Sequence, residues 1–157
     1  MSELAVPKRR AEVAVELVGG LRRRVTVFLA PSSASHEGGE RLSELLEGAG
    51  EFFPARDADE PGMTFLRRAT VVVAEAAPEQ ATAPGPDDVT LPSEYEVDVT
   101  LDDGRVLRGL LSFVLPSDRC RLADYLNEPT RFLPLHGGEL LRLVNKRHVT
   151  RVAVVER

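Results

Sequence analysis

The chain has little of several residue types on which common functions depend. Its 157 residues include one cysteine, Cys120, no tryptophan and only 5% aromatic residues. A single cysteine excludes an intrachain disulfide, which favours a reducing cytoplasm. Scarce aromatics argue against a surface that stacks nucleic-acid bases. The sequence has no run of about 18 apolar residues, which predicts no membrane span, and its first residues lack the apolar run of a signal peptide.

The chain also lacks an excess of positive charge. Its formal net charge is −5, which argues against a protein dedicated to nucleic acid or to an anionic membrane. Hydrophobic residues make up 43% and charged residues 29% of the sequence, as is typical of a globular domain with a core. A chain of this length forms one ordinary domain or two very small ones.

One pattern occurs twice in the sequence. The segment 41–55 reads RLSELLEGAGEFFPA, and the segment 121–135 reads RLADYLNEPTRFLPL. The offset is 121 − 41 = 80 residues, and Phe52 and Pro54 fall on Phe132 and Pro134 at the same offset. This repetition predicts two related units of similar structure. Very small units are marginally stable alone, so we expect each to help bury the other, with two independent units on a linker as the alternative.

Composition divides the chain between these units. Residues 76–92 contain four prolines, one glycine and three acidic residues, which predicts an acidic linker without core contacts. The predicted boundaries are an N-terminal tail at 1–10, a first unit at 11–76, a linker at 77–93 and a second unit at 94–157.

The second unit shows the expected elements most clearly. YEVDVTL (95–101) alternates apolar and polar residues, as a half-buried strand does, and DDG (102–104) is typical of a hairpin turn. Gly109 in the following strand indicates a bulge or a sharp bend. RLADYLN (121–127) predicts a short helix, which Pro129 ends. Three short strands follow, and we expect this order in both units. The predicted core residues are Leu42, Leu46, Phe52, Leu122, Leu126 and Phe132.

The second unit resembles the Sm-like small β-barrel. The run VDVTLDDGRVLRGLLSF is similar to the first signature of that superfamily, and RLVNKRHVTRV is similar to the second. The matching residues of the first signature are Asp103, Gly104, Arg105, Gly109, Leu111 and Phe113. The resemblance implies a mostly β fold of two tandem Sm-like/SH3-like barrels, each with a short helix between its second and third strands. The RLxDYLN…RFxPL core also resembles an uncharacterised bacterial domain of unknown function.

The same resemblance implies binding residues. RNA-binding Sm-like proteins contact bases through a basic turn before the last strand, which here corresponds to Asn145, Lys146, Arg147 and His148. The turn in the first unit holds Arg67 and Arg68. The other base-contacting stretch of the family is replaced here by proline and a helix. RNA or nucleotide binding is therefore the alternative function.

Other candidate chemistry is sparse. The histidines His36, His136 and His148 lack metal-ligand spacing, so we expect no metal and no other cofactor. Arginines beside Cys120 favour a lowered thiol pKa, which leaves an enzyme as the third hypothesis, with no catalytic residues assigned. The run Arg22–Arg24 is typical of a charged strand edge. The sequence favours a non-enzymatic, cytoplasmic interaction or scaffold module with a protein partner, and a homo-oligomer is left open.

Overall fold

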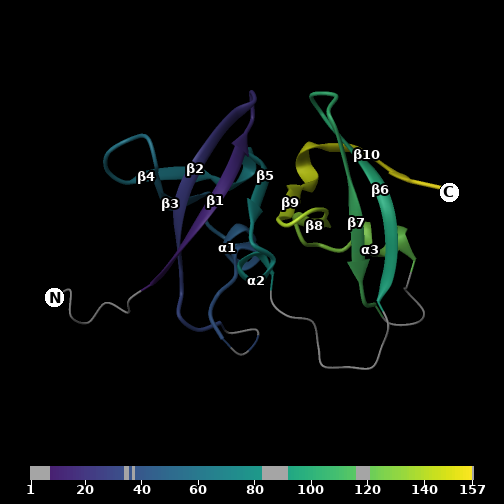
Figure 1. Ribbon diagram of the computed structural model, residues 1–157, viewed down its shortest axis with the longest axis horizontal. Helices are drawn as coiled ribbons and strands as arrows, with labels where there is room; N and C mark the ends of the chain where they lie inside the picture. Colours follow the sequence, from purple (N-terminus) through teal and green to yellow (C-terminus); the bar gives the residue numbers. More distant parts are fainter. Residues whose placement is uncertain (1–7, 34–35, 37, 83–91, 116–120, 157) are drawn as a thin grey trace.

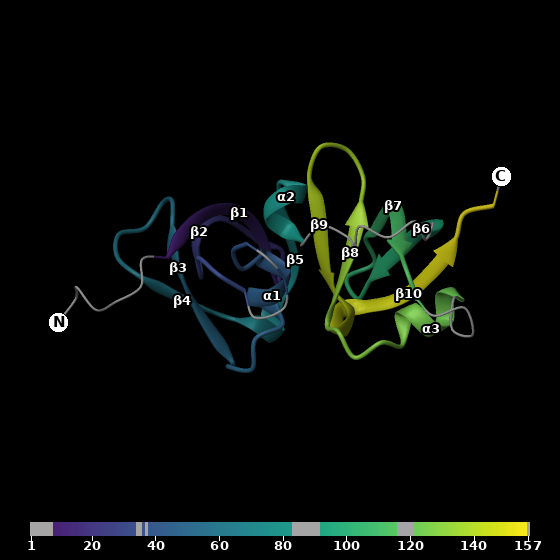
Figure 2. The ribbon, with the colours of Figure 1, turned by 90° about the horizontal axis from the view of Figure 1, so that it is seen from below.

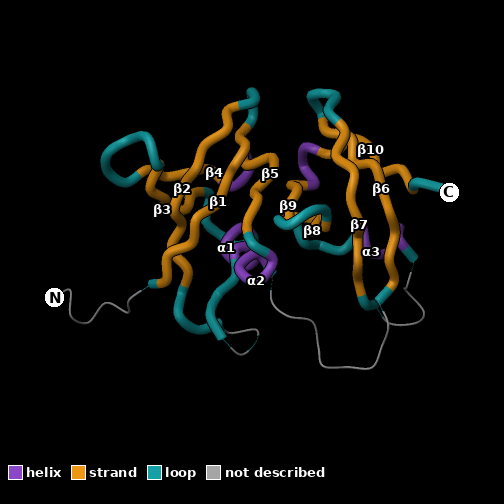
Figure 3. Tube along the Cα trace, in the orientation of Figure 1, coloured by secondary structure: helices purple, strands orange, loops and turns teal. Residues whose placement is uncertain are grey.

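The computed structural model describes residues 8–33, 36, 38–82, 92–115 and 121–156. The protein is mostly β, as the sequence predicts, and its strands form one ten-stranded antiparallel sheet (Figures 1 and 3). The first half contains β1 (Arg9–Leu17), β2 (Leu21–Leu29), α1 (Leu42–Leu46), β3 (Phe52–Asp57), β4 (Thr64–Arg67), η2 (Arg68–Thr70) and β5 (Val71–Ala76). The second half contains β6 (Ser93–Leu101), β7 (Val106–Phe113), α3 (Leu122–Leu126), β8 (Phe132–His136), β9 (Leu141–Asn145), η4 (Lys146–His148) and β10 (Val149–Val154).

The two halves share one strand order. The sheet runs β10-β6-β7-β8-β9-β5-β1-β2-β3-β4, so in each half the fifth strand lies beside the first and the fourth lies at the far end. The halves join where β9 pairs with β5, at the centre of Figure 1. The sheet does not close on itself, and β10 and β4 are its two ends. As predicted, a short helix lies between the second and third strands of each half.

The segment predicted to be a linker begins with an ordered helix, α2 (Pro78–Ala81). Ala81 is fully buried in the core of the first half, and α2 contacts β9, as Figure 2 shows. The prediction of no core contacts is therefore wrong at this position. Proline at the first helical turn is favourable because its missing N–H is not needed there. The predicted tail also differs, since β1 begins at Arg9. Residues 1–7 and 83–91 lie outside the described part of the chain.

Two hydrophobic clusters form the core, and each takes residues from both halves. The cluster of the first half includes Phe132, Leu141 and Leu143 from β8 and β9. The cluster of the second half includes Val72 and Val73 from β5. Because successive side chains of a strand point to opposite faces, the paired strands β5 and β9 can contribute side chains to both clusters. The two halves therefore bury part of each other's apolar surface.

Of the predicted core residues, some are buried and others are not. Leu42, Leu46 and Phe132 are buried, as predicted, whereas Leu122 and Leu126 are only half-buried against the second cluster. The prediction for Phe52 is wrong, because 46% of this residue is exposed. Side chains alternate along β3, and it is the next residue, Phe53, that faces the core with 1% exposure. Sequence offset alone did not distinguish these two phenylalanines.

Gly109 is required by a close approach of β8 rather than by a bulge. The register between β6 and β7 runs through Gly109 without a shift, so the predicted bulge is absent from this ladder. A Cβ atom on Gly109 would lie 2.6 Å from the Leu135 Cγ atom and 2.7 Å from the His136 carbonyl oxygen. The backbone oxygen cannot move aside without breaking the β7–β8 contact.

We predict that Gly109→Ala lowers the free energy of unfolding by about 1–3 kcal/mol, the usual cost of overpacking. Gly137→Ala is the matched control, since its added Cβ meets only ordinary contacts of 3.7 Å and longer. We expect the control to change stability by less than about 0.5 kcal/mol. Urea denaturation of both variants measures the difference, and equal stability of the two would contradict the packing argument.

Candidate functional site

The two predicted basic turns meet at the junction of the halves. Pairing of β5 with β9 places η2 beside η4, and a cleft of about 410 Å³ lies between them. Its lining residues are Arg68, Ala69, Thr130, Arg131, Phe132, Asn145, Lys146 and Arg147. Of the six predicted site residues, four therefore line one cleft, while Arg67 and His148 do not. Arg131 also lines this cleft, although it was not predicted as a site residue.

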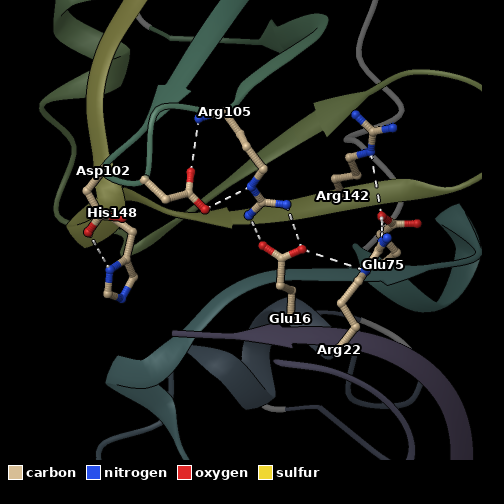
Figure 4. Close-up of polar contacts among 8 residues, drawn as sticks. Glu16, Arg22, Glu75, Asp102, Arg105, Arg142 and His148 are labelled. Carbon is tan, nitrogen blue, oxygen red and sulfur yellow. Dashed lines mark hydrogen bonds and ion pairs between the residues drawn. The ribbon is translucent and has the colours of Figure 1, made fainter. Parts of the chain in front are cut away.

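Asn145 and His148 are buried and hold the junction together. The Asn145 amide nitrogen donates to the Val71 carbonyl oxygen at 2.9 Å, and its amide oxygen accepts from the Arg147 N–H at 3.0 Å. The His148 Nε2 atom lies 2.7 Å from the Ala69 carbonyl oxygen, and Nδ1 lies 3.1 Å from an Asp102 carboxylate oxygen (Figure 4). Their polar atoms are engaged within the protein, so these two side chains stabilise the junction rather than offer free donors to a ligand.

Arg68 and Lys146, the first residues of η2 and η4, hold these turns to their own halves. Arg68 donates to the carbonyl oxygens of Leu45 at 2.9 Å and Phe52 at 3.1 Å. Lys146 donates from Nζ to the carbonyl oxygens of Leu126 at 3.0 Å and Glu128 at 2.8 Å. The Leu45 and Leu126 acceptors lie in the last turn of α1 and of α3, where carbonyl groups lack a partner within the helix ladder, and the Phe52 acceptor begins β3.

Burial lowers the pKa of two cations in the cleft. Burial, together with the positive charge of Arg131, lowers the pKa of the Arg68 guanidinium from its ordinary value. Burial also lowers the pKa of the Lys146 ammonium, against the opposing effect of Glu47 and Glu128. Arg131 and Arg147 are exposed at the mouth of the cleft. The arrangement can attract an anion, with Arg131 and Arg147 as its accessible cations.

A second polar cluster bridges the halves beside β1 and β9 (Figure 4). Glu16, only 5% exposed, accepts two hydrogen bonds from the Arg105 guanidinium across the junction, one of them at 2.8 Å. Glu75 lies 3.7 Å from Arg22 and 3.8 Å from Arg142. Each carboxylate is matched by arginine, and a bidentate arginine pair is among the stronger ionic contacts. The cluster therefore acts as a structural link between the halves.

The free end of the sheet at β4 carries an apolar surface. Phe52, Met63 and Phe65 are 46%, 46% and 62% exposed, although all three are large hydrophobic residues. They lie on or next to β3 and β4, and among the strands that the structure describes β4 pairs only with β3. The Arg67 guanidinium lies 4.8 Å from the centre of the Phe52 ring. We call Phe52, Met63 and Phe65 the β4-edge surface.

The histidines and the cysteine were the other candidate residues for a functional site. Among the residues that the structure describes, no group of three or more His, Cys, Asp or Glu side chains could hold a metal ion. His36 lies 2.5 Å from a Glu44 carboxylate oxygen, and Cys120 lies outside the described residues. Within the same part of the chain, no helix has the length and apolar character needed to cross a membrane.

Comparison of the chain with protein-family models, curated proteins and solved structures finds no match.

The β4-edge surface and Arg131 were not predicted from the sequence. A signal for the first was present, because Phe52 is equivalent to Phe132 at the 80-residue offset, but a repeat cannot say which copy of a residue is covered. Arg131 stands next to Phe132 and enters the cleft only because β8 lies beside the junction.

Proposed function

We propose that the protein is a non-enzymatic interaction module that binds a protein partner through the β4-edge surface. The observation that carries this proposal is the exposure of Phe52, Met63 and Phe65 together at a strand edge with which no other described strand pairs. Clustered exposed apolar side chains are typical of interaction sites, and an unpaired edge offers backbone N–H and C=O groups to an added strand. A cytoplasmic location is part of the proposal, in keeping with the single cysteine.

We further propose that each half is a small barrel of the Sm-like/SH3-like type and that the chain arose by tandem duplication. Three features support this proposal: the shared strand order, the helix between second and third strands, and the common register of third and fourth strands. In Figure 2 the strands of the first half curve around α1, as in a strongly twisted small sheet.

The test is capture of partners from the native host by the tagged full chain and by a Phe65→Glu variant, both treated with nuclease. A charge at Phe65 should remove the captured proteins, because it must be desolvated in an apolar contact. Val106→Glu is the matched control, since Val106 is 55% exposed on a different strand, at one end of β7. Identical capture by all three proteins would refute the proposed surface.

The cleft between the basic turns favours a second candidate function, the binding of RNA or a nucleotide. Four cations line it, namely Arg68, Arg131, Lys146 and Arg147. The test is titration of a uridine-rich oligonucleotide at about 50 and about 200 mM salt. If phosphates are bound, affinity should fall with salt by a slope of about 0.7 per phosphate contact.

The matched variant for this titration is Arg131→Gln/Arg147→Gln. These two arginines are exposed, whereas Lys146 fastens α3 and its removal would disturb the fold. Loss of binding in the double variant would support the second candidate. Equal affinity of variant and wild type would place any binding elsewhere.

A further inference from the structure

The run Arg22–Arg24 on β2 divides between the two faces of the sheet. Arg23 turns toward Asp57, whose carboxylate oxygen lies 2.6 Å from the Arg23 Nε atom. Because side chains alternate along a strand, Arg22 and Arg24 share the opposite face. Both line a cleft of about 680 Å³ that takes residues from the two halves of the chain.

One row of residues crosses this cleft from β2 to β9. Residues directly opposite each other in paired strands point to the same face of a sheet. Arg24 lies opposite Ala14, Ala14 opposite Glu75, and Glu75 opposite Arg142. Ala14 has the smallest side chain of the row. It therefore forms the floor of the cleft, and an arginine stands at each end of the row.

Arg22 and Arg142 carry N–H groups that are not hydrogen-bonded to the nearest carboxylate. They lie 3.7 and 3.8 Å from the same Glu75 Oε1 atom (Figure 4). Both distances exceed those of hydrogen bonds. Glu16, the other carboxylate at this place, already accepts two hydrogen bonds from Arg105. An incoming carboxylate can thus accept from Arg22 and Arg142 without displacing a hydrogen bond to Glu75.

The cleft continues into a second one of about 560 Å³, which extends along β1 to Arg10. The two clefts share five lining residues, namely Ala14, Arg24, Ala58, Glu75 and Leu140. We call the two clefts together the junction groove. Six arginines and four acidic residues line it, an excess of two positive charges on a chain whose net charge is −5. The groove therefore favours an anionic ligand.

The arginines are spread along the groove, with apolar side chains between them. Arg22 lies opposite Glu16 on β1, six residues after Arg10. At about 3.4 Å per residue, this separates the two cations by roughly 20 Å. Ala14 and Leu140, which is 44% exposed, line both clefts. A single phosphate group reaches only one part of such a groove, whereas about six residues of extended chain span it.

We propose that the junction groove binds an extended acidic segment of a partner protein, in which carboxylates alternate with apolar side chains. The carboxylates pair with the arginines, whose planar guanidinium groups suit carboxylate oxygens. The apolar side chains pack on Leu140 and on the alanines of the floor. This site lies on other residues than the β4-edge surface, so it goes beyond the proposed function and does not depend on it.

The test is fluorescence anisotropy of the full chain with a labelled eight-residue peptide of alternating aspartate and leucine. We expect binding at about 50 mM salt that weakens at about 200 mM, because salt screens exposed charges. Arg24→Gln/Arg142→Gln should bind the peptide about tenfold or more weakly than wild type. Arg131→Gln/Arg147→Gln is the matched control, since it removes the same charge at the other cleft, and it should bind like wild type.

A further variant, Ala14→Leu, raises the floor of the groove and keeps every charge. It should also bind about tenfold more weakly, because the added side chain occupies the space of the peptide. Ala14 faces the cleft rather than the core, and surface ion pairs contribute little to stability. The urea midpoints of all three variants should therefore match wild type, which shows that weaker binding does not come from unfolding.

Four outcomes would overturn the inference. The first is no binding of the peptide at about 50 mM salt up to near-millimolar protein. The second is an equal loss in the two double variants, which would show general attraction to positive charge. The third is an Ala14→Leu variant that binds like wild type, which would place the peptide outside the groove. The fourth is tighter binding of a uridine-rich oligonucleotide that depends on Arg24 and Arg142, which would assign the groove to phosphates instead.

Discussion

Phe132→Ala is expected to lower the free energy of unfolding by about 3–5 kcal/mol, the usual cost of truncating a buried phenylalanine. Phe132 is 4% exposed and packs in the core cluster of the first half although it belongs to the second. Its removal leaves a cavity at the junction, where both clusters meet. The loss should therefore destabilise both halves in a single unfolding transition.

Phe52→Ala is the matched control for this experiment. Phe52 occupies the equivalent position of the first half but is 46% exposed, so its truncation should cost less than about 1 kcal/mol. Guanidinium denaturation of both variants and the wild type measures the two losses. Equal losses for the two phenylalanines would show that the halves do not share a core at Phe132.

Asn145→Ala is expected to lower the free energy of unfolding by about 1–3 kcal/mol. The substitution leaves the Val71 carbonyl oxygen without its 2.9 Å donor and removes the acceptor of the Arg147 N–H. Val71 is fully buried, so water cannot replace the lost donor there without opening the junction.

Arg147→Ala is the control for Asn145→Ala. Arg147 follows in the same turn, but its side chain is exposed, and its truncation should change stability by less than about 0.5 kcal/mol. Thermal and denaturant melts of the two variants separate a structural role from a ligand-binding one. A neutral Asn145→Ala would argue that this side chain is free for a ligand after all.

The local elements were predictable from short-range patterns. Alternation in residues 95–101 predicted the strand that becomes β6, and the repeated RL motif predicted both α1 and α3. Patterns of this kind work because a strand or a short helix depends on neighbouring residues. The predicted basic turns are also correctly placed immediately before the last strand of each half, at η2 and η4.

Which copy of the repeated phenylalanine is buried was not predictable from the sequence, since Phe52 and Phe132 were both predicted to be buried and only Phe132 is. Leu42 and Leu46 face the core of their own half and were assigned correctly, whereas Phe52 was not. Whether a phenylalanine at this repeated position is covered depends on a strand from the other half, which the local sequence does not contain. The same reasoning applies to Ala81. Its segment has the composition of a linker, but in the tertiary structure its helix, α2, packs beside β9.

The sequence by itself determined the mostly β composition, the repeated pattern, the turns and the basic residues, because each follows from local residue types and spacing. Only the tertiary structure decided that β9 pairs with β5, that Arg131 joins Arg68 and Lys146 at one cleft, and that Asn145 is buried at the junction. Pairing between strands almost 70 residues apart depends on how whole apolar faces fit together, and no local pattern encodes that fit.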